Sequence, residues 1–261
     1  MKKIALIGYE GFVGSAIFKI FSQDKNVEII GINRKNFESY FGKKFDVLIE
    51  AGCNSKKYLA DDDPVNELEK SVVHRLKTLT KFNADFHIHI SSVDVYEDLS
   101  KKELTTESTQ ISSSSSNYGS HKLLAETLVQ HYADDWLIFR LSGMVGAGLR
   151  KNPIYDILND SELFINKHSQ YQYISTSFVA NAIYRIYNLG INNEIFNVAG
   201  QGLISPYEIA TLFKKKIKIS DQIQNLKPRI VDIDCNKIST HIDLPNSKDE
   251  IKEFIKKLNK Y

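Results

Sequence analysis

The sequence contains little cysteine. Only Cys53 and Cys235 occur among 261 residues, and they lie far apart at no recognisable metal-ligand spacing. We therefore expect neither a structural disulfide nor a bound metal. Such sparse cysteine usage is typical of a protein from a reducing compartment.

The sequence also lacks a long apolar run. The apolar start Ile4–Ile7 is followed at once by Gly8, which is typical of a buried first strand and not of a signal peptide. No stretch approaches the ~20 apolar residues that span a bilayer. We expect a cytoplasmic protein without membrane contacts.

An excess of charge of one sign is missing as well. The formal net charge is +2, so nothing predicts a nucleic acid or another polyanion as partner. Hydrophobic residues make up 42% and charged residues 25% of the chain, as in an ordinary soluble globular protein.

Short apolar runs alternate with helical patterns in the first half of the chain. The runs predict buried strands at Lys3–Gly8, Val27–Asn33, Asp46–Gly52, Phe86–Ser92 and Trp136–Ser142. Amphipathic patterns between them predict helices at Val13–Ser22, Pro64–Phe82 and Tyr118–Ala133. Strands without strict alternation, separated by helices, predict a doubly wound parallel sheet of the Rossmann type in the α/β class.

The pattern becomes less regular after Gly146. A helix over Phe178–Leu189 and a strand over Glu194–Ala199 are expected to return to the sheet. We therefore predict a dinucleotide-binding domain from residues 1–145 and 177–200. Residues 146–176 and 201–261 would form a small discontinuous substrate-binding lobe. The serine run Ser112–Ser116 is expected to be a mobile loop beside the active site.

The first strand runs directly into a glycine-rich turn. Gly8, Gly11 and Gly14 follow the GxxGxxG spacing and open the first helix. Such glycines let the backbone turn tightly and approach a pyrophosphate at the helix N-terminus. Four further residues are expected to border the cofactor from this turn and from the end of the third strand: Phe12, Val13, Ala51 and Gly52.

The place of the usual ribose-binding acid holds Asn33 and Arg34 instead. Without a carboxylate after the second strand, the ribose diol of NAD loses a partner and a 2′-phosphate meets no repulsion. Arg34 offers a bidentate partner for that phosphate. These residues favour NADP as cofactor and leave NAD open.

A phenol and an ammonium stand four residues apart in Tyr118-Gly-Ser-His-Lys122. On a helix both project from one face. The ammonium and a bound nicotinamide cation together are expected to lower the pKa of the phenol for proton exchange with a substrate oxygen. Ser91 and Ser92, which end the fourth strand, offer a hydroxyl to hold that oxygen. His121 points about 100° away from Lys122 on an ideal helix and is expected to be incidental.

The spacing alone is unspecific, because Tyr40 and Lys44 repeat it. That second pair lies in a loop too short for a catalytic helix. Tyr118 and Lys122 instead open a long amphipathic helix that follows a strand ending in serines, which favours them as the catalytic pair.

Taken together, these segments resemble the extended short-chain dehydrogenase/reductases, the branch with nucleotide-sugar epimerases, dehydratases and 4-ketoreductases. The matching segments are GYEGFVG, DVLIEAG, HISSVDVY, YGSHKLLAE, FRLSGMVGAG, EIFNVAG and ISPYEIA. The resemblance implies that Ser92 polarises the substrate carbonyl and that Tyr118 is the acid/base. It implies that Lys122 binds the cofactor ribose and supports Tyr118. It further implies substrate contacts at Ser92, Asp94, Ser142 and Gly143, and a homodimer.

The residues narrow the reaction within this family. Dehydratases carry an Asp-Glu pair after the catalytic hydroxyl, but here Ser92 is followed by Val93 and Asp94. No cysteine lies near Ser92 in the sequence, which disfavours the reductases that also epimerise. We predict NADPH-dependent reduction of a 4-keto, first of all 6-deoxy, nucleotide sugar. A 4-epimerase with retained NAD(P), or a non-enzymatic NAD(P)-binding scaffold, stays open.

Overall fold

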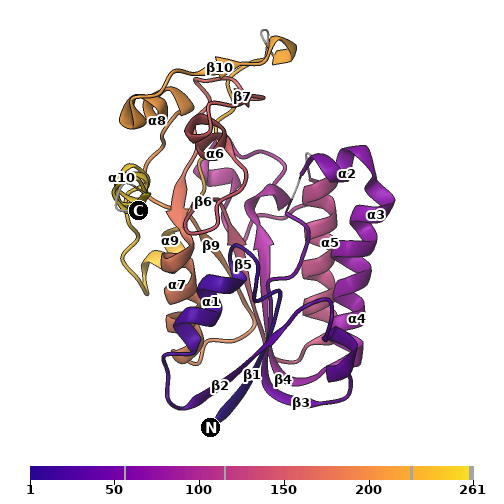
Figure 1. Ribbon diagram of the computed structural model, residues 1–261. Helices are drawn as coiled ribbons and strands as arrows, with labels where there is room; N and C mark the ends of the chain where they lie inside the picture. Colours follow the sequence, from indigo (N-terminus) through magenta and orange to yellow (C-terminus); the bar gives the residue numbers. More distant parts are fainter. Residues whose placement is uncertain (56, 115, 224–225, 259–261) are drawn as a thin grey trace. The chain divides into compact units, whose positions relative to one another are not determined.

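The computed structural model describes residues 1–55, 57–114, 116–223 and 226–258. Its main sheet has the strand order β2-β1-β3-β4-β5-β9 (Figure 1). The strands are β1 (Lys2–Ile7), β2 (Val27–Ile32), β3 (Lys44–Glu50), β4 (Asn83–Ser92), β5 (Trp136–Leu141) and β9 (Glu194–Val198). All neighbouring pairs from β2 to β5 are parallel. The predicted doubly wound α/β fold and the return of β9 to the sheet are confirmed.

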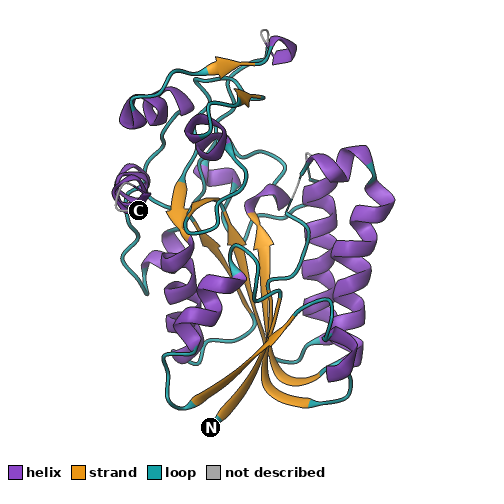
Figure 2. Cartoon of the chain, in the orientation of Figure 1, coloured by secondary structure: helices purple, strands orange, loops and turns teal. Residues whose placement is uncertain are grey.

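Helices cover both faces of this sheet (Figure 2). One face carries α1 (Gly14–Phe21) and α7 (Thr176–Asn188). The other carries α3 (Pro64–Leu68), α4 (His74–Lys81) and α5 (Asn117–Tyr132). Because helices cover both faces, the middle of each core strand is apolar and buried, as in Ile4–Ile7 of β1 and Val47–Ile49 of β3.

The chain reverses its winding direction between β1 and β3. β1 pairs with β2 on one side and with β3 on the other, so the connections leave toward opposite faces. In open α/β sheets a ligand binds outside the carboxyl ends of the strands at such a switch point. The glycine-rich turn lies at that place.

The helix predicted over Pro64–Phe82 contains a π-helical turn. Asp63 caps α3 by accepting a hydrogen bond from the amide of Asn66 at 3.2 Å, and Pro64 occupies the first helical turn. A π-helical turn, Glu69–Val73, then separates α3 from α4, and α2 (Tyr58–Asp62) precedes them. Helical turns thus run without a break from Pro64 to Lys81, as predicted, but a pattern of 3.6 residues per turn did not reveal the one wider turn among them.

The link between β2 and β3 holds only one 3₁₀ turn, Phe37–Tyr40, as its shortness predicted. Phe37 packs with Phe45 and Phe82 in the apolar cluster at this end of the sheet. Further 3₁₀ turns are Val93–Val95, Lys102–Leu104 and Asp221–Ile223.

The described residues divide into two compact units. The first comprises residues 1–97, 107–141 and 177–196, and the second residues 98–106, 142–176 and 197–261. Compared with the predicted boundaries, the second unit also includes residues 98–106, 142–145 and 197–200. Whether this division corresponds to a cofactor domain and a substrate lobe stays a prediction.

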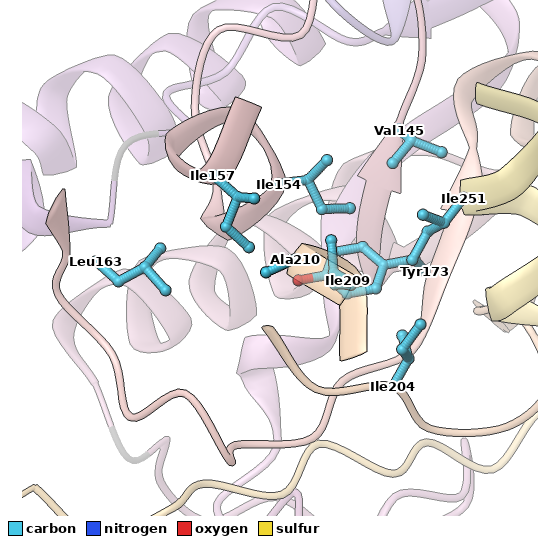
Figure 3. Packing of buried hydrophobic residues seen from close by; sticks show 9 residues of the cluster. All are labelled: Val145, Ile154, Ile157, Leu163, Tyr173, Ile204, Ile209, Ala210 and Ile251. Carbon is cyan, nitrogen blue, oxygen red and sulfur yellow. The ribbon is translucent and has the colours of Figure 1, made fainter. Parts of the chain in front are cut away.

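The second unit has its own small sheets and core. β6 (Gly143–Val145) pairs with β8 (Tyr173–Ser175), and β7 (Glu162–Leu163) with β10 (Lys218–Ile219). Its helices are α6 (Pro153–Leu158), α8 (Pro206–Phe213), α9 (Asn236–Ser239) and α10 (Ser247–Leu258). Figure 3 shows its buried cluster, in which Ile154, Ile209 and Ile251 surround Tyr173.

None of the helices within the described ranges is both long and apolar enough to cross a membrane.

Candidate active site

The glycine-rich turn is packed too tightly for side chains. Gly8 has φ +79°, and a Cβ on it would lie 2.5 Å from Cα of Gly52. A Cβ on Gly14 would lie 2.1 Å from the carbonyl oxygen of Gly8, so glycine allows the start of α1 to pack on the end of β1. Gly11 closes the turn by donating its amide to the Gly8 carbonyl at 2.9 Å.

This turn fits a dinucleotide pyrophosphate. Gly11 is exposed and carries no Cβ, so an anion can approach the backbone there. Phe12 and Val13 lead into α1, where Val13 provides no side-chain cap for the first amides. Uncapped amides at a helix N-terminus attract a phosphate.

The residues after β3 pack directly against the glycine-rich turn. The amide of Ala51 donates to the Ile7 carbonyl at 3.0 Å, and the amide of Gly52 donates to Glu50 Oε1 at 2.8 Å. Both predicted cofactor residues thus lie directly beside Gly8, as their position after neighbouring parallel strands required.

At the end of β2, the Asn33 side chain is half-buried and that of Arg34 is exposed. The Asn33 amide nitrogen donates to Asn36 Oδ1 at 2.8 Å, and its side-chain Nδ2 donates to Glu10 Oε1 at 3.1 Å. Arg34 is exposed. A carboxylate therefore reaches the end of β2 after all, but it comes from the glycine-rich turn and not from β2 itself.

The two serines that end β4 have different tasks. Ser91 Oγ donates to Glu126 Oε1 at 2.5 Å, and Arg140 Nη2 donates to Glu126 Oε2 at 2.7 Å. All three side chains are buried, so this network ties β4 and β5 to α5. Ser91 is thus engaged in the packing of α5 on the sheet, and Ser92 stays the predicted substrate-binding hydroxyl.

Ser92 lies within a small charged group. Its Oγ donates to Asp94 Oδ2 at 2.8 Å and accepts from the Asp94 amide at 3.2 Å. Lys57 Nζ lies 2.5 Å from the same Asp94 oxygen. The Asp94 side chain is buried, whereas Lys57 is more than half exposed. The carboxylate thus has a cationic partner in addition to Ser92.

The start of α5 is fixed against this group. The Gly119 amide donates to Ser116 Oγ at 3.1 Å, which caps the helix, and Ser114 Oγ donates to the Asp94 carbonyl at 2.8 Å. A Cβ on Gly119 would lie 2.0 Å from that carbonyl oxygen, so only glycine allows the approach. The serine run, expected to be mobile, is therefore anchored at Ser114 and Ser116. Ser115 lies outside the described residues.

Tyr118 and Lys122 share one face of α5, as their spacing predicted. Both are buried, and Lys122 Nζ lies 5.2 Å from the centre of the Tyr118 ring. Lys122 Nζ also donates to Cys53 Sγ at 2.6 Å. Lys122 is therefore held between the phenol and Cys53, which lies three residues after the end of β3.

Burial raises the pKa of the Tyr118 phenol above its ordinary value. Lys122 acts in the opposite direction, but its effect is smaller, and the nearby charges of Cys53, Asp94 and Glu67 add to the rise. The ammonium alone therefore does not outweigh burial, and the predicted lowering of the pKa, which also needs a bound nicotinamide cation, stays a prediction. For Lys122, burial acts against the charged form. Cys53 and Tyr118 outweigh it, so the Lys122 pKa is raised.

The sequence-based argument missed Cys53. Its Sγ lies 3.8 Å from the Ile90 carbonyl, two residues before Ser92. The expectation that no cysteine lies near Ser92 was wrong, because adjacent parallel strands bring the ends of β3 and β4 together. Cys53 directly follows the predicted third strand, and that position was the available signal.

Glu67 and His121 were also missed. Glu67 is buried, accepts hydrogen bonds from Ser71 Oγ and Asn54 Nδ2, and forms an ion pair with Nδ1 of His121. His121 is not incidental, since it joins α5 to α3 one residue before Lys122. No sequence signal marks this pair, because Glu67 lies 54 residues earlier in the chain.

Ser142 and Gly143, two predicted substrate residues, belong to the second unit. The Ser142 amide donates to the Val198 carbonyl at 3.1 Å. Its buried Oγ has no hydrogen-bond partner among the described residues. A Cβ on Gly143 would lie 2.9 Å from the Tyr173 ring. Their contact with a substrate stays a prediction.

Within the part of the chain that the structure describes, no three His, Cys, Asp or Glu side chains are grouped to hold a metal ion.

Comparisons with known proteins concern the family and the fold of this chain. Residues 71–199 match the NAD dependent epimerase/dehydratase family. No curated protein matches the chain. A dTDP-4-dehydrorhamnose reductase from Clostridium acetobutylicum is similar in structure, with a TM-score of 0.83 and 20% identity over 98% of this chain and 99% of that one.

Two further solved structures share the fold. RMD from Pseudomonas aeruginosa, complexed with NADPH, has a TM-score of 0.81 and 15% identity over 98% of both chains. The UDP-glucose 4-epimerase from Thermotoga maritima, with UDP-glucose, has a TM-score of 0.78 and 16% identity over 99% of both chains. Residues 71–199 are thus similar to the NAD dependent epimerase/dehydratase family, and nearly the whole chain has the fold of a solved dTDP-4-dehydrorhamnose reductase and of a solved UDP-glucose 4-epimerase.

Proposed function

We propose that the protein reduces the 4-keto group of a nucleotide sugar, with a 6-deoxy sugar as first choice and NADPH as the preferred hydride donor. One observation carries the proposal. Tyr118 and Lys122 open a helix that is fixed, through Gly119 and Ser114, against the loop holding Ser92 and Asp94. The similarity to a dTDP-4-dehydrorhamnose reductase and to the NADPH complex of RMD supports the substrate class and the cofactor.

In this proposal NADPH, when bound, supplies a hydride to the carbonyl carbon. Tyr118 donates the proton to the carbonyl oxygen, because burial keeps its phenol protonated. Lys122 holds the ribose and, as a buried ammonium, stabilises the phenolate left behind.

Ser92 orients the carbonyl oxygen by turning its hydroxyl from Asp94 toward the substrate. Lys57 then remains paired with Asp94, so the carboxylate is not left without a partner when Ser92 turns away.

Simple reduction requires no acid or base at the neighbouring sugar carbons. Val93 stands where a dehydratase needs an acid. The nearest thiol, Cys53, is engaged with Lys122. These residues favour a reductase over a dehydratase or a reductase that also epimerises.

The test is oxidation of NADPH, followed by nicotinamide absorbance, against a panel of 4-keto-6-deoxy nucleotide sugars generated in situ. One panel member should be reduced rapidly, and Tyr118→Phe should lower its turnover by about 10³-fold while cofactor affinity is kept. Tyr40→Phe is the matched control, because Tyr40 repeats the spacing to a lysine without the catalytic helix, and it should retain turnover.

Oxidation of no panel member would contradict the reductase. Interconversion of nucleotide sugars without net NADPH consumption would then indicate a 4-epimerase with retained cofactor. Cofactor binding without any turnover would indicate a scaffold.

A further inference from the structure

Glu10 carries a carboxylate from the glycine-rich turn to the end of β2. Its Oε1 accepts hydrogen bonds from Asn33 Nδ2 at 3.1 Å and from the Tyr9 hydroxyl at 3.0 Å. Glu10 lies 23 residues before Asn33 in the chain, so the sequence places no acid at this position.

The two donors are themselves held in place. Asn33 Oδ1 accepts from the Lys35 amide at 2.9 Å, which leaves Nδ2 to donate to Glu10. The Tyr9 ring packs on Gly31 of β2, where a Cβ would lie 2.6 Å from the ring, and its centre lies 5.5 Å from that of Phe18. The hydrogen bond to Glu10 raises the pKa of Tyr9, so the phenol remains a donor at neutral pH.

The end of β2 is where dinucleotide-binding folds discriminate between NAD and NADP. A carboxylate there accepts hydrogen bonds from the ribose diol of NAD, whereas an arginine accommodates the 2′-phosphate of NADP. In this chain the carboxylate and the arginine come from different segments. Arg34 follows β2, and the carboxylate of Glu10 arrives from the turn after β1.

We propose that Glu10 determines cofactor selectivity by receiving the ribose diol of NAD(H) and repelling the 2′-phosphate of NADP(H). Arg34 acts in the opposite sense, so the protein binds both dinucleotides and Glu10 limits its preference for NADP(H). This inference rests on dinucleotide binding at the glycine-rich turn, and not on the nature of the substrate.

Direct binding tests the inference. The dissociation constants of NADH and NADPH are measured by fluorescence titration for the wild-type protein, Glu10→Gln, Glu10→Asp and Arg34→Ala. Glu10→Gln should tighten NADPH about 10-fold and weaken NADH about 3-fold, because it removes a charge and a charge-assisted hydrogen bond. Glu10→Asp keeps the charge but shortens the reach, and it should change selectivity less.

Arg34→Ala should weaken NADPH and leave NADH nearly unchanged. Glu38→Gln is the matched control, because it makes the same charge change on the 3₁₀ turn after β2, where Glu38 pairs with Lys77 at 2.9 Å. It should leave the ratio of the two constants unchanged. The effect of Glu10→Gln on NADPH should also shrink at high salt, since the repulsion of an exposed carboxylate is screened.

An unchanged ratio in Glu10→Gln, or the same change in Glu38→Gln, would overturn the inference while leaving the proposed reductase intact. Failure of the wild-type protein to bind either dinucleotide would overturn both.

Discussion

At Tyr118, burial and a neighbouring charge shift the pKa of the phenol in opposite directions. The ammonium of Lys122 favours the phenolate, but the loss of hydration on burial disfavours it more strongly, and the Tyr118 pKa rises. The four-residue spacing in the sequence shows that Lys122 lies beside Tyr118, but it does not show how deeply this face of α5 is buried. The result suits a proton donor better than a proton acceptor.

This shift predicts the pH dependence of reduction. The phenol is needed in its protonated form, and a pKa above the usual value of about 10 keeps it protonated across the neutral range. We expect kcat/KM for reduction to stay flat from about pH 6 to about pH 9 and to fall only above that. A tenfold loss per pH unit beginning near neutrality would contradict Tyr118 as the acid in this state.

Gly8 and Gly42 both have positive φ, so comparing them distinguishes the cost of the backbone conformation from the cost of a steric clash. Gly8 has φ +79° and Gly42 has φ +71°, but only at Gly8 would a Cβ meet other atoms. Gly42→Ala should cost about 1–2 kcal/mol of unfolding free energy, the cost of the conformation alone. Gly8→Ala should cost more than about 3 kcal/mol, because Gly52 must also move.

Urea unfolding measures both changes, and dinucleotide titration measures the consequence. Gly8→Ala should lose binding, whereas Gly42→Ala should keep it. Equal losses of binding in the two variants would show that the close contact between the turn and the end of β3 is unimportant.

At the scale of elements, the helix packing around α5 explains why several sequence predictions were wrong. A helical projection correctly placed Tyr118 and Lys122 on one face. It placed His121 elsewhere, but a projection of one helix does not show what lies on its other side. There α3 supplies Glu67, and the pair is buried between the two helices.

This buried pair should stabilise the protein far more than an exposed one. His121→Leu leaves the buried carboxylate of Glu67 without its partner on α5 and should cost about 3 kcal/mol of unfolding free energy. Lys252→Ala, which removes the exposed pair with Asp249 on α10, should cost less than about 0.5 kcal/mol. Denaturant unfolding measures both.

The double variant Glu67→Leu/His121→Leu gives the sharper result. With both charges removed, no buried carboxylate is left unpaired, so the double variant should be more stable than His121→Leu alone. A double variant that is less stable by the sum of both single losses would show that the pair contributes only packing.

At the scale of the whole molecule, the family resemblance implies a homodimer through α5 and the helix before it. Apolar side chains remain exposed on these elements: Val65, Val73, Leu124 and Tyr132. We expect the protein in solution to have twice the chain mass of 29.8 kDa. Leu124→Glu should yield a monomer by light scattering, because a charge on a buried interface is costly.

Leu189→Glu is the control for this prediction, since Leu189 is an equally exposed apolar residue just after α7, on the other face of the sheet. It should leave the mass unchanged. A wild-type monomer would contradict the predicted homodimer.

The amino-acid sequence by itself determined the doubly wound parallel sheet, its strand segments and the position of each motif relative to them. Buried parallel strands are continuous apolar runs, and their carboxyl ends meet at one edge. Gly8, Gly52, Ser92 and Tyr118 could therefore be assigned to that edge from local patterns alone. The resemblance to the NAD dependent epimerase/dehydratase family followed from the same motifs.

Only the tertiary structure decided how the charged side chains are paired. Glu10 with Asn33, Glu67 with His121, Cys53 with Lys122 and Lys57 with Asp94 each join segments separated by at least 23 residues. Periodicity describes one segment at a time, so it carries no information about such pairs. Burial and pairing then set the protonation of Tyr118, and the chain must be folded before either exists.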